Sequence, residues 1–132
     1  MITTKAASAM IAAGEQHAAE IGVPVIIAVL DAGAHQKALV RMDGAVLGSL
    51  DVAISKARTS VLFEARSEAV WDYCKPGAPA PGLEHSNGGL ATFAGGIPLR
   101  DKTGALIGAI GVSGGAVDQD RDIADADRKS VV

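Results

Sequence analysis

Two charged residues that could bind a ligand, Arg41 and Asp43, lie two positions apart in the segment Arg-Met-Asp-Gly-Ala. In an extended strand, residues with this spacing point to the same face. They can therefore form a short ion pair at the end of a strand, or they can face one pocket together. A guanidinium holds a carboxylate through two parallel hydrogen bonds, so Arg41 is a candidate ligand-binding residue. Both interpretations of the pair stay open.

Two further candidates, Lys56 and His85, can move protons. Lys56 lies in a largely apolar helical segment. Its side chain either packs its methylene groups on the protein and extends the ammonium into solvent, or it stays near apolar groups, has a lowered pKa and acts as a base. His85 lies in the segment Glu-His-Ser-Asn of a long loop, and an imidazole exchanges protons near neutral pH. The chain has neither the His and Cys pairs nor the Glu–His spacing of metal sites, so no metal site is predicted. The candidate catalytic residues are His85, Lys56 and Arg41.

Glycine-rich segments supply the remaining candidates. Residues 108–120, GAIGVSGGAVDQD, do not form a phosphate-binding loop. Such a loop needs a lysine after its glycines, and none follows Gly114-Gly115. The acidic residues that come next would also repel a phosphate at the start of the following helix. The segment predicts a turn at Ser113, where bare backbone can contact a ligand. The backbone N–H groups of Gly95 and Gly96 could stabilise a developing negative charge. The predicted ligand-binding set is Arg41, Asp43, Lys56, His85, Gly95, Gly96 and Ser113.

Hydrophobic periodicity and breaker residues predict the elements that position these side chains. Helices are expected from Thr3 or Thr4 to Ile21 and over 45–63, 67–73 and 118–131. Strands are expected over 23–31, 36–43, 92–101 and 105–114, as two β-hairpins. Residues 74–92 hold three of the five prolines and predict a long loop. This order favours an α+β fold with one central antiparallel sheet flanked by helices.

Length and composition limit the class of protein. A chain of 132 residues predicts a single domain over 1–132, and 48% hydrophobic residues with only 3% aromatic ones predict a core of Ala, Val, Ile and Leu. The net charge of −3 argues against nucleic acid or an anionic membrane as a partner. One cysteine rules out an internal disulfide, and no export signal is evident at the start. We therefore expect a cytoplasmic protein that does not insert in membranes.

Four segments together resemble the GlcG/HbpS family, also called DUF336 or haem-degrading. They are VLDAGAHQKALVRMDGA (29–45), AISKARTS (53–60), AGGIPLRDKTGALIGAIGVSGG (94–115) and DQD (118–120). The resemblance covers almost the whole chain and extends to the C-terminal domain of PduO-type cobalamin adenosyltransferases. It implies a profilin- or PAS-like sandwich and self-association into dimers or higher homo-oligomers. It also makes haem a candidate cofactor, with His85 as the candidate axial ligand.

These observations leave three functional hypotheses. The first is a protein that binds a small ligand, either haem or another anionic cofactor or metabolite, between the helix with Lys56 and the loop with His85. The second is a cofactor-independent enzyme of the isomerase, lyase or hydrolase type that acts on a small organic acid or carbonyl compound. The third is an oligomeric protein that serves assembly only.

Overall fold

The structure is a computed structural model that describes residues 1–129 of the chain. Its helices are α1 (Thr4–Glu20), α2 (Ser49–Phe63), α3 (Ser67–Cys74), the short 3-10 helix η1 (Leu83–His85) and α4 (Val117–Lys129). Its strands are β1 (Ile26–Asp31), β2 (Gln36–Arg41), β3 (Gly96–Arg100) and β4 (Leu106–Ser113). The predicted order of helices and strands is confirmed. The last two positions of the helix predicted over 118–131 lie outside the described residues.

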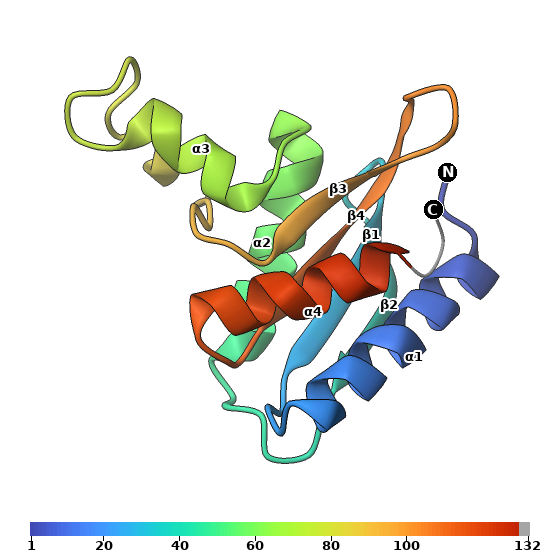
Figure 1. Ribbon diagram of the computed structural model, residues 1–132. Coiled ribbons are helices and arrows are strands. Elements are labelled where there is room, and N and C mark those ends of the chain that lie inside the picture. Colours follow the sequence, from blue (N-terminus) through green and yellow to red (C-terminus); the bar gives the residue numbers. More distant parts are fainter. Residues whose placement is uncertain (130–132) are drawn as a thin grey trace.

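The four strands form one antiparallel sheet in the order β2-β1-β4-β3. Each predicted hairpin is present, and β1 pairs with β4 to join them (Figure 1). Strand β1 is central, and its residues from Ile26 to Leu30 are buried, as expected for an apolar strand covered on both faces. Pro98 lies in β3, which is an edge strand and so can tolerate a residue without an N–H group. The predicted α+β class is confirmed, whereas the narrower likeness to profilin and PAS domains stays a prediction.

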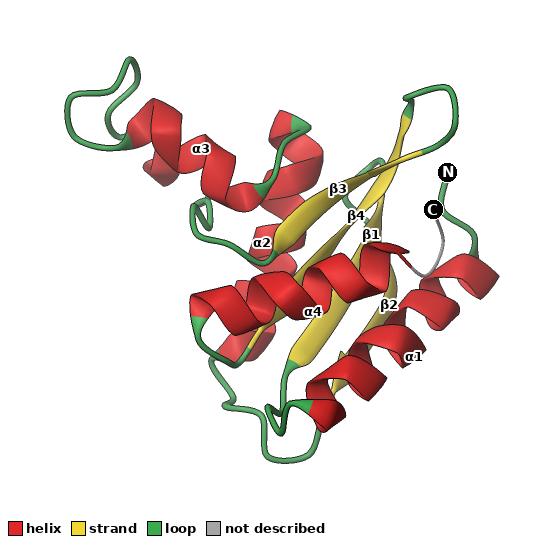
Figure 2. Ribbon diagram, in the orientation of Figure 1, coloured by secondary structure: helices red, strands yellow, loops and turns green. Residues whose placement is uncertain are grey.

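Helices cover both faces of the sheet. Figure 2 shows α1 and α4 side by side in front of the strands, with α2 behind them. Alternate residues of β1 supply the two cores. Ile27 and Val29 belong to the larger core on the side of α1 and α4, whereas Ile26 and Ala28 pack against Ala53 of α2. This alternation follows from the two-residue period of a strand.

The boundaries differ from the predicted ones mainly at the starts of elements. Helix α1 begins as predicted, because the Thr3 hydroxyl accepts a hydrogen bond from the N–H of Ala6 at 3.1 Å. Helix α2 begins at Ser49, four residues later than predicted, since residues 43–44 and 47–48 form two turns before it, and Gly44 in the first turn has a φ of +84°. Strand β1 begins at Ile26 because Pro24 cannot donate a ladder hydrogen bond. None of the helices within residues 1–129 is long and apolar enough to cross a membrane.

A buried carboxyl group lies between α1 and α4. Asp127 is fully buried and lies against Gly14, where a Cβ would overlap its carboxylate. Burial raises the pKa of Asp127 from 3.8 to about 9, and the negative charge of Glu15 acts in the same direction. A hydrogen bond with the backbone of Gly14 opposes the shift without reversing it. Asp127 is therefore protonated in the folded protein at neutral pH.

We expect Asp127 to make stability depend on pH. Because its pKa is higher in the folded than in the unfolded chain, its contribution is fully present below about pH 4 and is lost as the pH rises toward 9. The variant Asp127→Asn cannot ionise, so its free energy of unfolding should fall less between pH 5 and 9 than that of the wild type. Urea unfolding at several pH values measures this, with the exposed Asp122→Asn as the control. Equal pH dependence of wild type and Asp127→Asn would contradict the assignment.

Candidate functional site

Lys56 lies at the centre of the candidate site and is almost completely buried, with 1% of its surface exposed. It leaves α2 on one face of the sheet and reaches α4 on the other. Its Nζ donates to the carbonyl of Val112 at 2.8 Å and to Oδ2 of Asp120 at 3.0 Å. The ring of Phe93 lies over the same nitrogen, with its centroid 5.0 Å away. Lys56 is thus not a solvated lysine, which was one of the two interpretations of the sequence.

Asp120 holds the other end of this ion pair. The glycine-rich turn after β4 brings the first turn of α4 against Lys56, and Oδ1 of Asp120 accepts the N–H of Gly115 at 2.9 Å. A phosphate therefore has no place at this helix start, which agrees with the rejection of a phosphate-binding loop. From the sequence, Asp120 was only one of the acidic residues expected to repel a phosphate at the start of this helix. Its pairing with Lys56 joins residues 64 positions apart and has no local signal.

Burial shifts both partners toward their neutral forms. It lowers the pKa of Lys56 and raises the pKa of Asp120, because a low-dielectric interior disfavours charge. The attraction between the two groups opposes each shift without reversing it. Glu68 of α3 adds a second negative charge that acts on Lys56, and its Oε1 is buried without a hydrogen-bond partner among the described residues. Titratable groups whose pKa values are shifted by burial and by a specific charged partner are typical of functional sites.

The two glycines of the predicted set leave room for Lys56. Gly95 has a φ of +132°, and a Cβ there would lie 2.5 Å from the carbonyl oxygen of Val112 and 2.8 Å from Nζ of Lys56. A Cβ at Gly96 would overlap the backbone carbonyl of Lys56. The N–H of Gly96 already donates to the hydroxyl of Ser67 at 2.9 Å. In this structure it is therefore not available to stabilise a developing charge.

Arg41 and Ser113 lie in one row across the same end of the sheet. Ile26 of β1 pairs with Arg41 on one side and with Ser113 on the other. Ser113 is 6% exposed, whereas Arg41 and Asp43 are exposed. No ion pair joins Arg41 to Asp43 in the described part of the chain.

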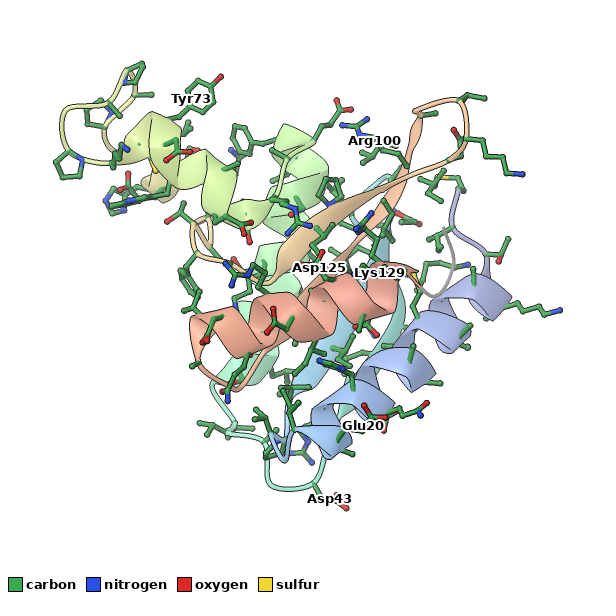
Figure 3. The ribbon with its side chains drawn as sticks, viewed as in Figure 1. Glu20, Asp43, Tyr73, Arg100, Asp125 and Lys129 are labelled. Carbon is green, nitrogen blue, oxygen red and sulfur yellow. The ribbon has the colours of Figure 1, made fainter. Side chains whose placement is uncertain are left out.

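His85 is exposed at the end of η1, which packs on α3 beyond the opposite edge of the sheet. Figure 3 shows Asp43 and Tyr73, which belongs to α3, at opposite ends of the molecule. The structure therefore does not bring Arg41 and Asp43 next to His85. It gathers Lys56, Gly95, Gly96 and Ser113 around one end of the sheet, and it leaves His85 in η1, whose Leu83 lines a separate groove. The functional roles of all these residues stay predictions.

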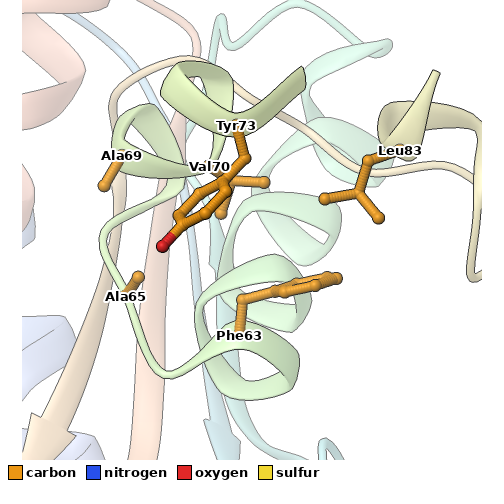
Figure 4. Close-up of a pocket in the computed structure, with 6 residues that line it drawn as sticks. All are labelled: Phe63, Ala65, Ala69, Val70, Tyr73 and Leu83. Atoms are coloured by element: carbon orange, nitrogen blue, oxygen red, sulfur yellow. The ribbon is translucent and has the colours of Figure 1, made fainter. Parts of the chain in front are cut away.

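An apolar groove of about 310 Å³ lies between α3, the C-terminal end of α2 and η1 (Figure 4). Phe63 and Tyr73 form its aromatic walls, and Leu83 closes one end, two residues before His85. The remaining lining residues are Ala65, Ala69 and Val70. Tyr73 is 62% exposed, so the groove presents a large aromatic surface to solvent. The sequence pattern predicts a functional loop around His85, but it gives no sign of this groove, because residues from three separate elements line it.

Two further grooves meet at Phe93, which is 44% exposed. One, of about 400 Å³, runs between α2 and the loop before β3, and its lining includes Val52, Ser55 and Ala91. The other, of about 300 Å³, is lined by Trp71, Thr92 and Phe93. The loop expected to be functional thus borders every groove described near the buried lysine.

Comparison with known proteins identifies the family. The model of the family "Haem degrading protein HbpS-like" matches residues 2–128. An uncharacterized 15.0 kDa protein from the dhaT-dhaS intergenic region of Citrobacter freundii is 40% identical over 125 residues, which cover 94% of this chain and 87% of that protein. The GlcG protein of Escherichia coli is 34% identical over 113 residues, or 86% of this chain and 81% of GlcG.

Solved structures agree with this result. The crystal structure of Klebsiella pneumoniae ORFY matches with a TM-score of 0.95 and 34% identity, over 98% of this chain and 90% of that one. The crystal structure of a PduOC:haem complex matches with a TM-score of 0.94 and 34% identity, over 98% and 94% of the two chains. The resemblance seen in the sequence is confirmed: the chain belongs to the HbpS-like (DUF336) family, related to GlcG and to the PduO C-terminal domain.

Proposed function

We propose that this protein binds haem or another flat, anionic cofactor in the groove lined by Phe63, Tyr73 and Leu83. The main support is the close similarity to the PduOC:haem complex, since related chains with the same fold often keep the same kind of site. Similarity of fold alone does not carry a function, so the residues of this chain must also suit the ligand.

The groove suits the porphyrin in shape and chemistry. A porphyrin is flat and largely apolar, and it packs well against aromatic side chains. Phe63 and Tyr73 offer such surfaces, and Val70 adds an aliphatic contact. A volume of about 310 Å³ is at the lower end for ligand pockets, so a bound haem would keep one edge in solvent. Its charged propionates favour that arrangement.

His85 is our candidate iron ligand, because it lies in η1 two residues after the groove residue Leu83. It is exposed, it follows Leu83 closely along η1, and a neutral imidazole nitrogen is a common ligand of haem iron. Arg41 lies near the other end of the molecule, so it would not contact the propionates of a haem bound there. Bound haem would supply redox chemistry, whereas the chain itself would set the orientation of the ring and the access of water.

A haemin titration tests this proposal. We expect a Soret shift that saturates with one haemin per chain in the wild type, and a loss of affinity of roughly tenfold or more in His85→Ala. His35→Ala is the matched control, because His35 is exposed in the turn between β1 and β2. Ala69→Trp should also weaken binding, since the indole would fill the groove. An unchanged haemin spectrum, or equal affinity in all variants, would overturn the proposal.

Self-association stays a separate prediction. Val46 and Leu47 are 67% and 70% exposed in the turn before α2, and adjacent exposed aliphatic side chains favour contacts between copies. Sedimentation of the wild type, with and without haemin, would separate assembly from ligand binding.

A further inference from the structure

One side chain, that of Phe93, lies both over the buried amine of Lys56 and in two surface grooves. Phe93 lines both grooves, and the underside of its ring lies over Nζ of Lys56. The ring is nearly half exposed, so no tightly packed core holds it in place. Rotation of Phe93 about its own side-chain bonds is the movement that the following proposal needs to connect a groove with Nζ.

The surroundings of Nζ suit a reactive amine. An ammonium has three N–H donors, and two of them are bound, by Val112 and Asp120. The Oε1 atom of Glu68 is buried without a hydrogen-bond partner among the described residues, although its charge acts on Lys56. A buried lysine loses its proton more easily than an exposed one, and the uncharged amine is the nucleophile. Asp120 lies 3.0 Å away, within reach of that proton.

We propose that Lys56 forms an imine with small aldehydes, with Asp120 as the proton acceptor and donor and with Phe93 as a movable cover. Nζ passes a proton to Asp120, and its free electron pair attacks the carbonyl carbon. The carbonyl double bond opens, and the new alkoxide oxygen takes a proton from the attacking nitrogen. The resulting carbinolamine loses its hydroxyl as water, which takes the proton back from Asp120. The net reaction joins one aldehyde to the lysine ammonium and releases one water, leaving a protonated imine. No oxidant or reductant is needed.

The size of the grooves limits the substrate class. Each groove offers about 300 to 400 Å³, and the aldehyde must pass the position of the Phe93 ring to reach Nζ. Thr92 and Ser55 on the groove walls can form hydrogen bonds with a polar substituent. Short, polar aldehydes therefore fit better than bulky aromatic ones. This activity does not depend on the haem proposal, because the haem groove contains neither Lys56 nor Phe93.

Reductive trapping tests the proposal. The folded protein is incubated with limiting acetaldehyde and cyanoborohydride at neutral pH, and each lysine is followed by peptide mass spectrometry. Trapping adds the mass of the aldehyde less one oxygen. We expect Lys56 to be modified faster than Lys102, which is exposed in the turn between β3 and β4. Unfolding in urea should abolish this preference.

Variants make the test specific. Phe93→Ala should raise the trapping rate at Lys56 about fivefold, which corresponds to removing a ring–cation contact of about 1 kcal/mol. Leu62→Ala, which changes an exposed hydrophobic side chain on α2 that lines neither groove at Phe93, should leave the rate unchanged. Circular dichroism checks that each variant is folded. Modification of Lys102 without modification of Lys56, in both the wild type and folded Phe93→Ala, would overturn the proposal.

Discussion

The variant Asp120→Ala is expected to lower the free energy of unfolding by about 3–5 kcal/mol. The substitution leaves the Lys56 ammonium buried without its ion-pair partner, and it also removes the acceptor of the Gly115 N–H. The side chains of Lys56 and Asp120 are 1% and 3% exposed, so water cannot replace the lost contact. Guanidinium unfolding followed by circular dichroism measures the change.

Two control variants distinguish the loss of the Lys56–Asp120 ion pair from a general destabilisation of α4. Asp118→Ala changes an exposed carboxylate in the same helical turn, and its free energy of unfolding should differ from the wild type by less than about 1 kcal/mol. The double variant Lys56→Met, Asp120→Leu should recover most of the loss, because two apolar side chains can replace a buried ion pair. A small effect of Asp120→Ala alone would contradict the assigned role of the pair.

The variant Gly111→Ala is expected to destabilise the protein by about 3 kcal/mol. Gly111 faces α2, where a Cβ would overlap the carbonyl of Ala53 and lie 2.7 Å from the N of Ala57. Both obstructing atoms belong to the helix backbone, so no side chain can rotate away, and α2 must move off the sheet. Because α2 carries Lys56, the same shift should also disturb the ion pair with Asp120.

Gly48→Ala is the matched control for this substitution. A Cβ at Gly48 meets no atom within 4 Å, and its φ of −59° is allowed for alanine. Its free energy of unfolding should stay within about 1 kcal/mol of the wild type, as for most surface substitutions. Equal stability of Gly111→Ala and Gly48→Ala would show that α2 does not pack as closely as described.

The secondary structure and the family could be predicted from the sequence because their signals are local or lie in ordered motifs. The apolar run at Ile26–Leu30 specified a strand buried on both faces, and the prolines of residues 74–82 excluded helix and central strand. The short links inside each hairpin fixed which strands pair within it. They did not fix which strands join the hairpins, and the pairing of β1 with β4 was seen only in the structure.

The candidate site was predictable in part. Lys56, Gly95 and Gly96 were predicted to belong to one ligand-binding set, and they do meet in space, whereas their roles stay predictions. The sequence could not show that Asp120 is the partner of Lys56, that Phe93 covers it, or that Arg41 and His85 lie far from each other. Each of these facts depends on contacts between residues remote in the chain.

By itself, then, the sequence determined the order of the elements, the apolar faces of the strands and membership of the HbpS-like family, because short-range periodicity and backbone preference encode them. Only the tertiary structure decided which polar groups are withdrawn from water. Burial and the distance between charges depend on how α2, α3 and α4 pack around the sheet, and no local pattern records that packing.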